Sequence, residues 1–174
     1  NILRFTGPGT VTVTASQAGS QRHLTAENVS RTFTVATAQI LFDDAAAAAG
    51  LGGSDALASA TPFGGGITNL EKYAFNMDLD SLDLRTMVDG GSSGLPLLQI
   101  EAGDSPCWTL QYVRRKGSGL DYTPKMSSTL VSDSFVAVSE AETVTSINEY
   151  WERVEICAPM PNGPLFVIVE VSFP

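Results

Sequence analysis

The chain has 174 residues, of which 43% are hydrophobic and 17% are charged, and its formal net charge at pH 7 is −9. This length leaves room for one substantial domain, or for a small domain plus an incomplete piece of another. The apolar fraction is enough to build a hydrophobic core, which argues against wholesale disorder. The acidic balance disfavours binding to nucleic acids and anionic membranes, which depends on Lys and Arg, and no apolar run approaches the roughly 18 residues of a membrane span.

Residues 1–36 are predicted to form β-strands. Apolar and hydroxyl side chains alternate along them, with Val11 and Val13 on one face of a strand and Phe33 and Val35 on one face of another. The expected strands cover residues 2–5, 10–14 and 31–35. So few strands cannot bury both faces of a sandwich by themselves. We therefore expect this segment to pack on the rest of the chain or on a partner.

Residues 37–80 are predicted to form a linker region with one or two short helices. The Ala-rich residues 39–49 are followed by Gly50, a residue suited to the end of a helix. A loop rich in Gly, Ser and Ala follows. Thr68 and Glu71 then have the spacing of a capping box, in which each side chain accepts a hydrogen bond from the other residue's backbone N–H. A second short helix is expected to begin there.

Residues 81–174 are again predicted to be β. The alternation is clearest near the C-terminus, where Val167, Val169 and Val171 share one face of a strand. The expected strands cover residues 84–88, 96–101, 107–114, 120–124, 134–139, 151–158 and 164–173. Short strands at this spacing, separated by Gly or Pro, favour a mainly β fold with a β-sandwich of immunoglobulin-like or jelly-roll-like type.

The chain has two cysteines, Cys107 and Cys157, and too few other ligands accompany them for a zinc site. In its predicted strand, Cys107 lies on the face opposite Trp108, Leu110 and Tyr112, which we expect in the core. Cys157 is likewise opposite the apolar residues of its own strand. The readings are a disulfide or two buried thiols, and because both sulfur atoms point to the same side, the parity favours a disulfide. A disulfide would imply an oxidising compartment.

Parts of the sequence resemble a known kind of protein. Residues 9–19 and 26–35 are similar to the closing strands of bacterial immunoglobulin-like repeats. Residues 61–76, with Tyr-Val-Arg-Arg at 112–115 and Tyr-Thr-Pro-Lys at 122–125, resemble a segment and a terminal β domain near the C-terminus of large secreted repeat proteins. The resemblance implies three units: residues 1–36, 37–80 and 81–174.

The resemblance also implies a place and a role. We expect a non-catalytic, extracellular or cell-surface module at the C-terminal end of a larger secreted or surface protein. The strand pattern begins at the very start of the sequence, with no signal peptide before it, which favours a piece of a longer chain.

The glycine-rich part of the linker region resembles a calcium-binding loop that has lost its acids. Thr61, Phe63 and Gly65 stand where such a loop has aspartates, and only Asn69 and Glu71 keep oxygen donors. Ca²⁺ takes six to eight oxygen ligands. We therefore expect no bound metal, and no cofactor.

No group of residues has the pattern of an active site. His23, the only histidine, stands in a loop rich in Gln, Ser and Arg and has no nucleophile motif with it. The acid pairs Glu140/Glu142 and Glu149/Glu152 are typical of solvated carboxylates in an acidic chain rather than of the paired acids of a glycosidase. We expect the protein not to be an enzyme.

Exposed aromatic rings give the alternative function, a carbohydrate-binding module appended to a secreted enzyme. The candidates are Tyr122, Tyr150 and Trp151, and since Tyr150 and Trp151 are adjacent, one of them should point away from the core. The main expectation is a structural or adhesive role, in which unpaired β edges of residues 1–36 join neighbouring repeat domains or another copy of the chain. A stalk cap, a secretion-associated module and an attachment module all fit that role.

Overall fold

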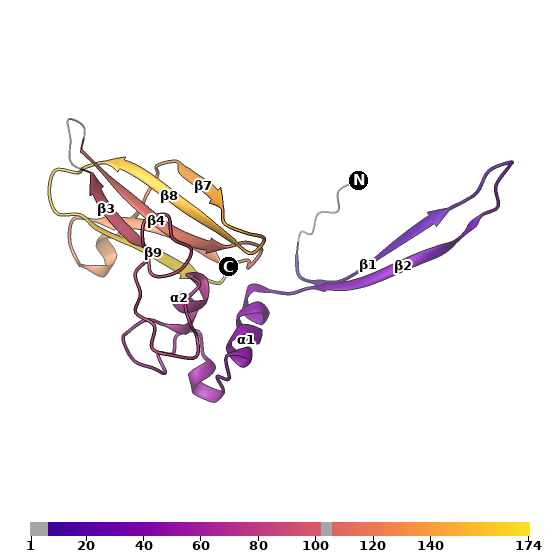
Figure 1. Ribbon diagram of the computed structural model, residues 1–174, viewed down its shortest axis with the longest axis horizontal. Coiled ribbons are helices and arrows are strands. Elements are labelled where there is room, and N and C mark those ends of the chain that lie inside the picture. Colours follow the sequence, from indigo (N-terminus) through magenta and orange to yellow (C-terminus); the bar gives the residue numbers. More distant parts are fainter. Residues whose placement is uncertain (1–6, 102–105) are drawn as a thin grey trace.

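The computed structural model of the chain describes residues 7–101 and 106–174, and the strand expected at residues 2–5 lies outside the described residues. The fold is mainly β, with three antiparallel sheets and two short α-helices, and is compatible with a β-sandwich. A two-stranded hairpin projects from a body that contains the other two sheets and both helices (Figure 1). Within the described ranges, no helix is long and apolar enough to cross a membrane.

The hairpin, called the arm below, consists of β1 (Gly9–Gln17) and β2 (Ala26–Val35). Hydroxyl side chains line one of its faces, where Thr12 pairs with Thr32 and their Oγ1 atoms are 2.8 Å apart. The turn at its tip depends on Gly19, which has a φ of +78°. A Cβ there would lie 2.7 Å from the carbonyl oxygen of His23, so the turn requires glycine.

The body, residues 37–174, is built around two antiparallel sheets. The larger sheet has the order β3 (Leu97–Glu101), β4 (Cys107–Arg115), β8 (Trp151–Pro159) and β7 (Glu142–Ser146). The smaller sheet has the order β6 (Val136–Ala137), β5 (Asp121–Ser127) and β9 (Phe166–Ser172). The chain passes from one sheet to the other at the turn between β4 and β5, and this turn positions the polar site described below.

The strands predicted between residues 96 and 173 are all present, but two predictions for this region need correction. Residues 84–88 form no strand: Thr86 makes an isolated bridge with Leu95, and the segment is fixed by the buried Asp83 instead. β7 was not predicted, because its side chains are all exposed and its single apolar residue, Val144, gives no amphipathic pattern.

Alternating side chains from both sheets meet in one core. Trp108, Leu110 and Tyr112 of β4 are at most 1% exposed, as the alternation predicted. Val169 of β9 packs against them from the smaller sheet. The linker region joins the same core through Ala74, which the helical pattern places on the inner face of the second helix, and through Ile67, Phe75 and Met77, which no periodic pattern marked.

The helices cover one side of this core. α1 (Ala38–Ala48) and α2 (Asn69–Ala74) meet through Phe42 and Tyr73, whose ring centroids are 5.6 Å apart. The predicted capping box of α2 is confirmed: Thr68 Oγ1 accepts from the backbone N–H of Glu71 at 3.2 Å, and the Glu71 carboxylate accepts from that of Thr68 at 2.7 Å. Two short 3₁₀ helices, η1 (Gly53–Ala56) and η2 (Ser132–Ser134), complete the described elements.

Asp83 holds the segment after α2, residues 78–85, in its fold. Its carboxylate, 8% exposed, accepts from the backbone N–H groups of Asp78 and Arg85 and pairs with the Arg85 guanidinium at 2.7 Å. Burial opposes ionisation of Asp83, but these hydrogen bonds and the Arg85 charge outweigh it and lower the pKa of the carboxyl. Ionised Asp83 therefore stabilises the fold above its unfolded-state pKa of about 4, and this contribution is lost as the pH falls through the lowered value.

We expect Asp83→Asn to lower the free energy of unfolding at pH 7 by about 1–3 kcal/mol, because the amide loses the ionic acceptor. Urea unfolding at a series of pH values should show this deficit shrink as the pH falls below 4. The exposed Asp80 provides the matched control Asp80→Asn, for which little change is expected. A deficit that stays constant down to pH 2 would show that the Asp83 charge is not its source.

Candidate functional site

Of the aromatic residues predicted to bind glycans, only Tyr150 presents an exposed ring, at 58% exposure. Trp151 is 8% exposed and belongs to the core. Tyr122 is half-buried, with its ring stacked 6.2 Å from that of Tyr112 and its hydroxyl donating to the carbonyl oxygen of Ala74 at 3.1 Å. Trp151 and Tyr122 therefore provide no exposed platform for a sugar. Each is covered by other parts of the fold, and the alternation of side chains along a strand could not predict this cover.

The predicted disulfide between Cys107 and Cys157 is wrong. Their strands are neighbours and both residues lie on the same face, but the register pairs Cys107 with Pro159 and Cys157 with Thr109. The two cysteines are thus diagonal neighbours, a relation in which Cα atoms lie about 7–8 Å apart. Disulfides span about 4.4–6.8 Å between Cα atoms. No disulfide joins the pair, and the inference of an oxidising compartment loses this support.

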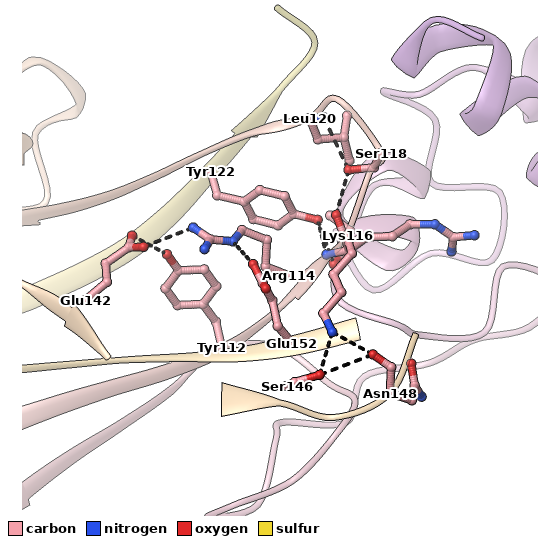
Figure 2. Close-up of polar contacts among 12 residues, drawn as sticks. Tyr112, Arg114, Lys116, Ser118, Leu120, Tyr122, Glu142, Ser146, Asn148 and Glu152 are labelled. Carbon is pink, nitrogen blue, oxygen red and sulfur yellow. Dashed lines mark hydrogen bonds and ion pairs between the residues drawn. The ribbon is translucent and has the colours of Figure 1, made fainter. Parts of the chain in front are cut away.

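A polar network occupies the end of the larger sheet where β4 leads into β5 (Figure 2). Arg114 Nε donates to Glu152 at 2.7 Å, and its Nη1 donates to Glu142 at 3.0 Å. The hydroxyl of Tyr112 donates to the same Glu142 at 3.0 Å. The register explains the grouping, since Arg114 is directly opposite Glu152 and β7 brings Glu142 to the same face. The role of Glu142 was missed because β7 was not predicted.

The surroundings of Arg114, Tyr112 and Tyr122 favour the protonated form of each side chain. Burial opposes the charge of Arg114, but the two glutamates outweigh it and raise the pKa of the guanidinium. Burial, followed by the charge of Glu142, raises the pKa of Tyr112. Burial likewise raises the pKa of Tyr122 to about 12. At neutral pH Arg114, Tyr112 and Tyr122 therefore stay protonated, and the stacking of Tyr122 of β5 on Tyr112 of β4 connects the two sheets.

Arg115, the next residue along β4, points to the opposite face of the strand. Its guanidinium carbon lies 4.5 Å from the ring centroid of Tyr73 and 5.1 Å from that of Trp151. These two cation–π contacts connect α2, which carries Tyr73, to the larger sheet, which carries Trp151. Burial raises the pKa of Tyr73 despite the nearby Arg115 charge, so the phenol stays protonated.

Lys116 follows at the start of the turn, and its Nζ donates to Ser146 Oγ and to the carbonyl oxygen of Asn148, both at 2.6 Å (Figure 2). Arg115, Lys116 and the residues up to Tyr122 line a shallow hollow of about 410 Å³, called the turn hollow below. Arg114, Glu152 and Asp121 also line it, so the hollow carries both charges.

The other candidate site is the apolar face of the arm. Ala15 pairs with Val29 on the face opposite the hydroxyl residues, and Val13 lies on the same face. In this outer part of the arm, Val13 is 40% exposed and Val29 is 57% exposed. At the tip, Leu24 is 94% exposed. This face of the arm thus exposes Val13 and Val29 to solvent, and it also carries Arg31 opposite Val13.

The structure also places the other residues that the sequence offered as candidate site residues. His23 lies exposed at the tip of the arm, where its backbone pairs with Ser20. Glu140 caps the backbone N–H of Ser139, and Glu149 is exposed. Asn69 uses its amide nitrogen to donate to loop carbonyl groups. In residues 7–101 and 106–174, no three His, Cys, Asp or Glu side chains gather as metal ligands would.

Comparisons of the chain with protein-family models, with curated proteins and with solved structures found no match. The arm and the turn hollow are therefore interpreted from their own geometry.

Proposed function

We propose that this protein is a non-catalytic structural module of a larger extracellular protein, and that its arm completes the β structure of a neighbouring immunoglobulin-like domain. The observation that carries the proposal is the arm itself. It projects from the body (Figure 1), and Val13 and Val29 leave its apolar face open to solvent. Two strands cannot bury such a face by themselves, so a further β layer is needed to cover it.

The size of this face favours a neighbour in the same polypeptide over a separate partner. Strands of 9 and 10 residues present a face about 30 Å long and about 10 Å wide. Covering it removes about 600 Å² from water, counting both partners, whereas a stable interface between separate molecules buries at least about 1,000 Å². A domain joined to the arm by the chain is held at a high effective concentration, so this small face is sufficient.

The placement of the acids supports a non-catalytic role. Glu142 and Glu152 are both held by Arg114, and the lone imidazole of His23 is at the tip of the arm, away from them. The carbohydrate-binding alternative has less support, because only Tyr150 of the three aromatic residues proposed to bind glycans has an exposed ring.

The test compares amide hydrogen exchange in the chain of residues 1–174 with exchange in the longer natural polypeptide. We expect the amides of β1 and β2 to exchange about 100-fold more slowly in the longer polypeptide, because a second β layer covers the apolar face. The amides of β4 and β8 should exchange equally in both. Val29→Asp, on the apolar face, should remove the added protection.

Thr12→Asp, on the hydroxyl face, is the matched control and should keep the added protection, since it places the same charge in the same hairpin. Equal exchange of the arm in the two polypeptides would contradict the proposal. Oligomers of the 1–174 chain that dissociate on Val29→Asp would also contradict it, because they would assign the face to a second copy.

A further inference from the structure

We propose that the free edge of β9 binds an extended peptide, with basic and apolar residues in alternation, as an additional antiparallel strand of the smaller sheet. The inference is independent of the arm and of the domain proposed to cover it. The space beside this edge, called the edge groove below, has a volume of about 340 Å³ and is lined by Thr68, Leu70, Glu71, Ile168, Val169, Glu170 and Val171.

The backbone of Pro124 in β5 shows which groups of β9 are left unpaired. Its carbonyl oxygen accepts from the N–H of Val138 at 2.9 Å, so it points toward β6 and away from β9. In an antiparallel pair, two opposite residues either exchange both of their hydrogen bonds or direct their groups away from each other. Val169 is opposite Pro124. The N–H and C=O of Val169 therefore point to the free edge.

The same orientation recurs at every second residue, so Val167 and Val171 also direct their N–H and C=O groups to the free edge. Within residues 7–101 and 106–174, no backbone group outside β5 pairs with these three valines. Val169 is only 9% exposed, and proteins seldom leave backbone groups unpaired where water has little access. An extended peptide that adds to a sheet edge provides the missing partners.

The start of α2 forms the opposite wall of the edge groove, since α2 lies beside β9 (Figure 1). A second hollow, lined in part by Leu70, Val171 and Phe173, continues the groove toward the end of β9. Side chains of an added strand alternate between two sides. On one side they meet the apolar wall around Leu70 and Val171, and on the other they pass Ile168 and Glu170.

The charge of the edge groove favours a basic occupant. Glu71 and Glu170 are its two charged residues, and both are acids. In the described parts of the chain, no Lys, Arg or His nitrogen lies within 4.0 Å of the Glu71 carboxylate, which accepts from Thr68 instead. Glu170 pairs with Lys125 but is still 54% exposed. Lysine or arginine residues of a peptide complement these two carboxylates.

The same charges disfavour a second copy of the chain as the occupant. Pairing of two β9 strands edge to edge would bring Glu71 and Glu170 of one copy close to those of the other. Each copy also has a net charge of −9, so the two repel each other at long range. A short basic peptide meets neither obstacle.

The experiment is a titration of the chain of residues 1–174 with the peptide acetyl-Lys-Val-Lys-Val-Lys-Val-Lys-amide, followed by calorimetry and amide hydrogen exchange. We expect a Kd of about 100 μM or tighter. In the free chain, the amides of Val169 and Val171 should exchange faster than those of Ile168 and Glu170, which face β5. The peptide should slow exchange at the two valines at least about tenfold.

Two methylated forms of the peptide test the pairing itself. In an antiparallel strand with its valines opposite Val169 and Val171, the N–H groups of the peptide valines face β9 and those of its lysines face away. Methylation of the valine nitrogens should therefore abolish binding, whereas methylation of the lysine nitrogens should preserve it. Equal effects of the two methylations would overturn the proposal.

Charge is tested on both partners. The peptide acetyl-Glu-Val-Glu-Val-Glu-Val-Glu-amide should bind at least about tenfold more weakly than the lysine peptide, and Glu170→Lys should weaken binding of the lysine peptide about tenfold. Glu149→Lys, at an exposed glutamate outside the edge groove, is the matched control and should change binding less than twofold. No binding of the lysine peptide, equal binding of the glutamate peptide, or unchanged binding in a folded Glu170→Lys variant would overturn the proposal. Dimers of the free chain with slow exchange at Val169 would also overturn it, because they would assign the edge to a second copy.

Discussion

Replacing Trp108 with alanine is expected to lower the free energy of unfolding of the body by about 3–5 kcal/mol. Trp108 is 1% exposed and lies in β4 between Ile100 of β3 and Ala158 of β8. Its truncation removes the apolar surface of the whole indole and leaves a cavity at the centre of the core. The neighbouring strands are fixed by their own hydrogen bonds, so they cannot close that cavity fully.

Tyr150→Ala is the control for this change, because it also truncates an aromatic ring, but one that directly precedes β8 and is 58% exposed. We expect this substitution to lower the free energy of unfolding by less than about 0.5 kcal/mol. Urea unfolding followed by circular dichroism measures both differences. A loss below 1 kcal/mol for Trp108→Ala would place the indole outside the core, and a large loss for Tyr150→Ala would show that its ring is packed rather than exposed.

Gly94→Ala is expected to have the second largest effect, a loss of about 2–4 kcal/mol in the free energy of unfolding. Gly94 has a φ of +112°, and a Cβ there would lie 2.7 Å from the backbone nitrogen of Met87. Its own N–H donates to the carbonyl oxygen of Phe75 at 3.0 Å. An alanine therefore combines an unfavourable backbone conformation with a collision against the main chain of Met87. Met87 is itself held by its N–H bond to the carbonyl oxygen of Leu95, so neither chain can move away without breaking a hydrogen bond.

Gly66→Ala separates these two contributions. Gly66 has a φ of +76°, but a Cβ built there meets nothing within 4 Å. We expect a loss of about 1–2 kcal/mol from the backbone conformation alone. Equal losses for Gly94→Ala and Gly66→Ala in parallel urea unfolding would show that the close approach at Gly94 does not exist in solution.

Local signals in the sequence predicted much of the fold. Alternation along β4 predicted the burial of Trp108 and Tyr112, because residues two apart in a strand share a face. Thr68 and Glu71 predicted the start of α2, because a capping box is satisfied within four residues of chain. These features depend on neighbours in sequence, and for that reason they could be found without the structure.

Two kinds of feature could not be predicted from local signals: those that depend on the pairing register of neighbouring strands, and those that depend on which element covers a sheet. Strand parity placed Cys107 and Cys157 on one face but could not show that they are diagonal rather than opposite. It also could not show that Arg115 and α2 would cover Trp151. The ion pairs of Arg114 needed the position of β7, whose exposed side chains carry no amphipathic signal.

We propose that the body folds as a complete unit and that the arm does not. Amide hydrogen exchange in the purified chain of residues 1–174 tests it most directly. We expect the amides of β4 and β8 to be the slowest, and those of β1 and β2 to exchange orders of magnitude faster, because an uncovered two-stranded hairpin is only marginally stable in water. Amides of β1 and β2 that exchange as slowly as those of β4 would contradict the claim.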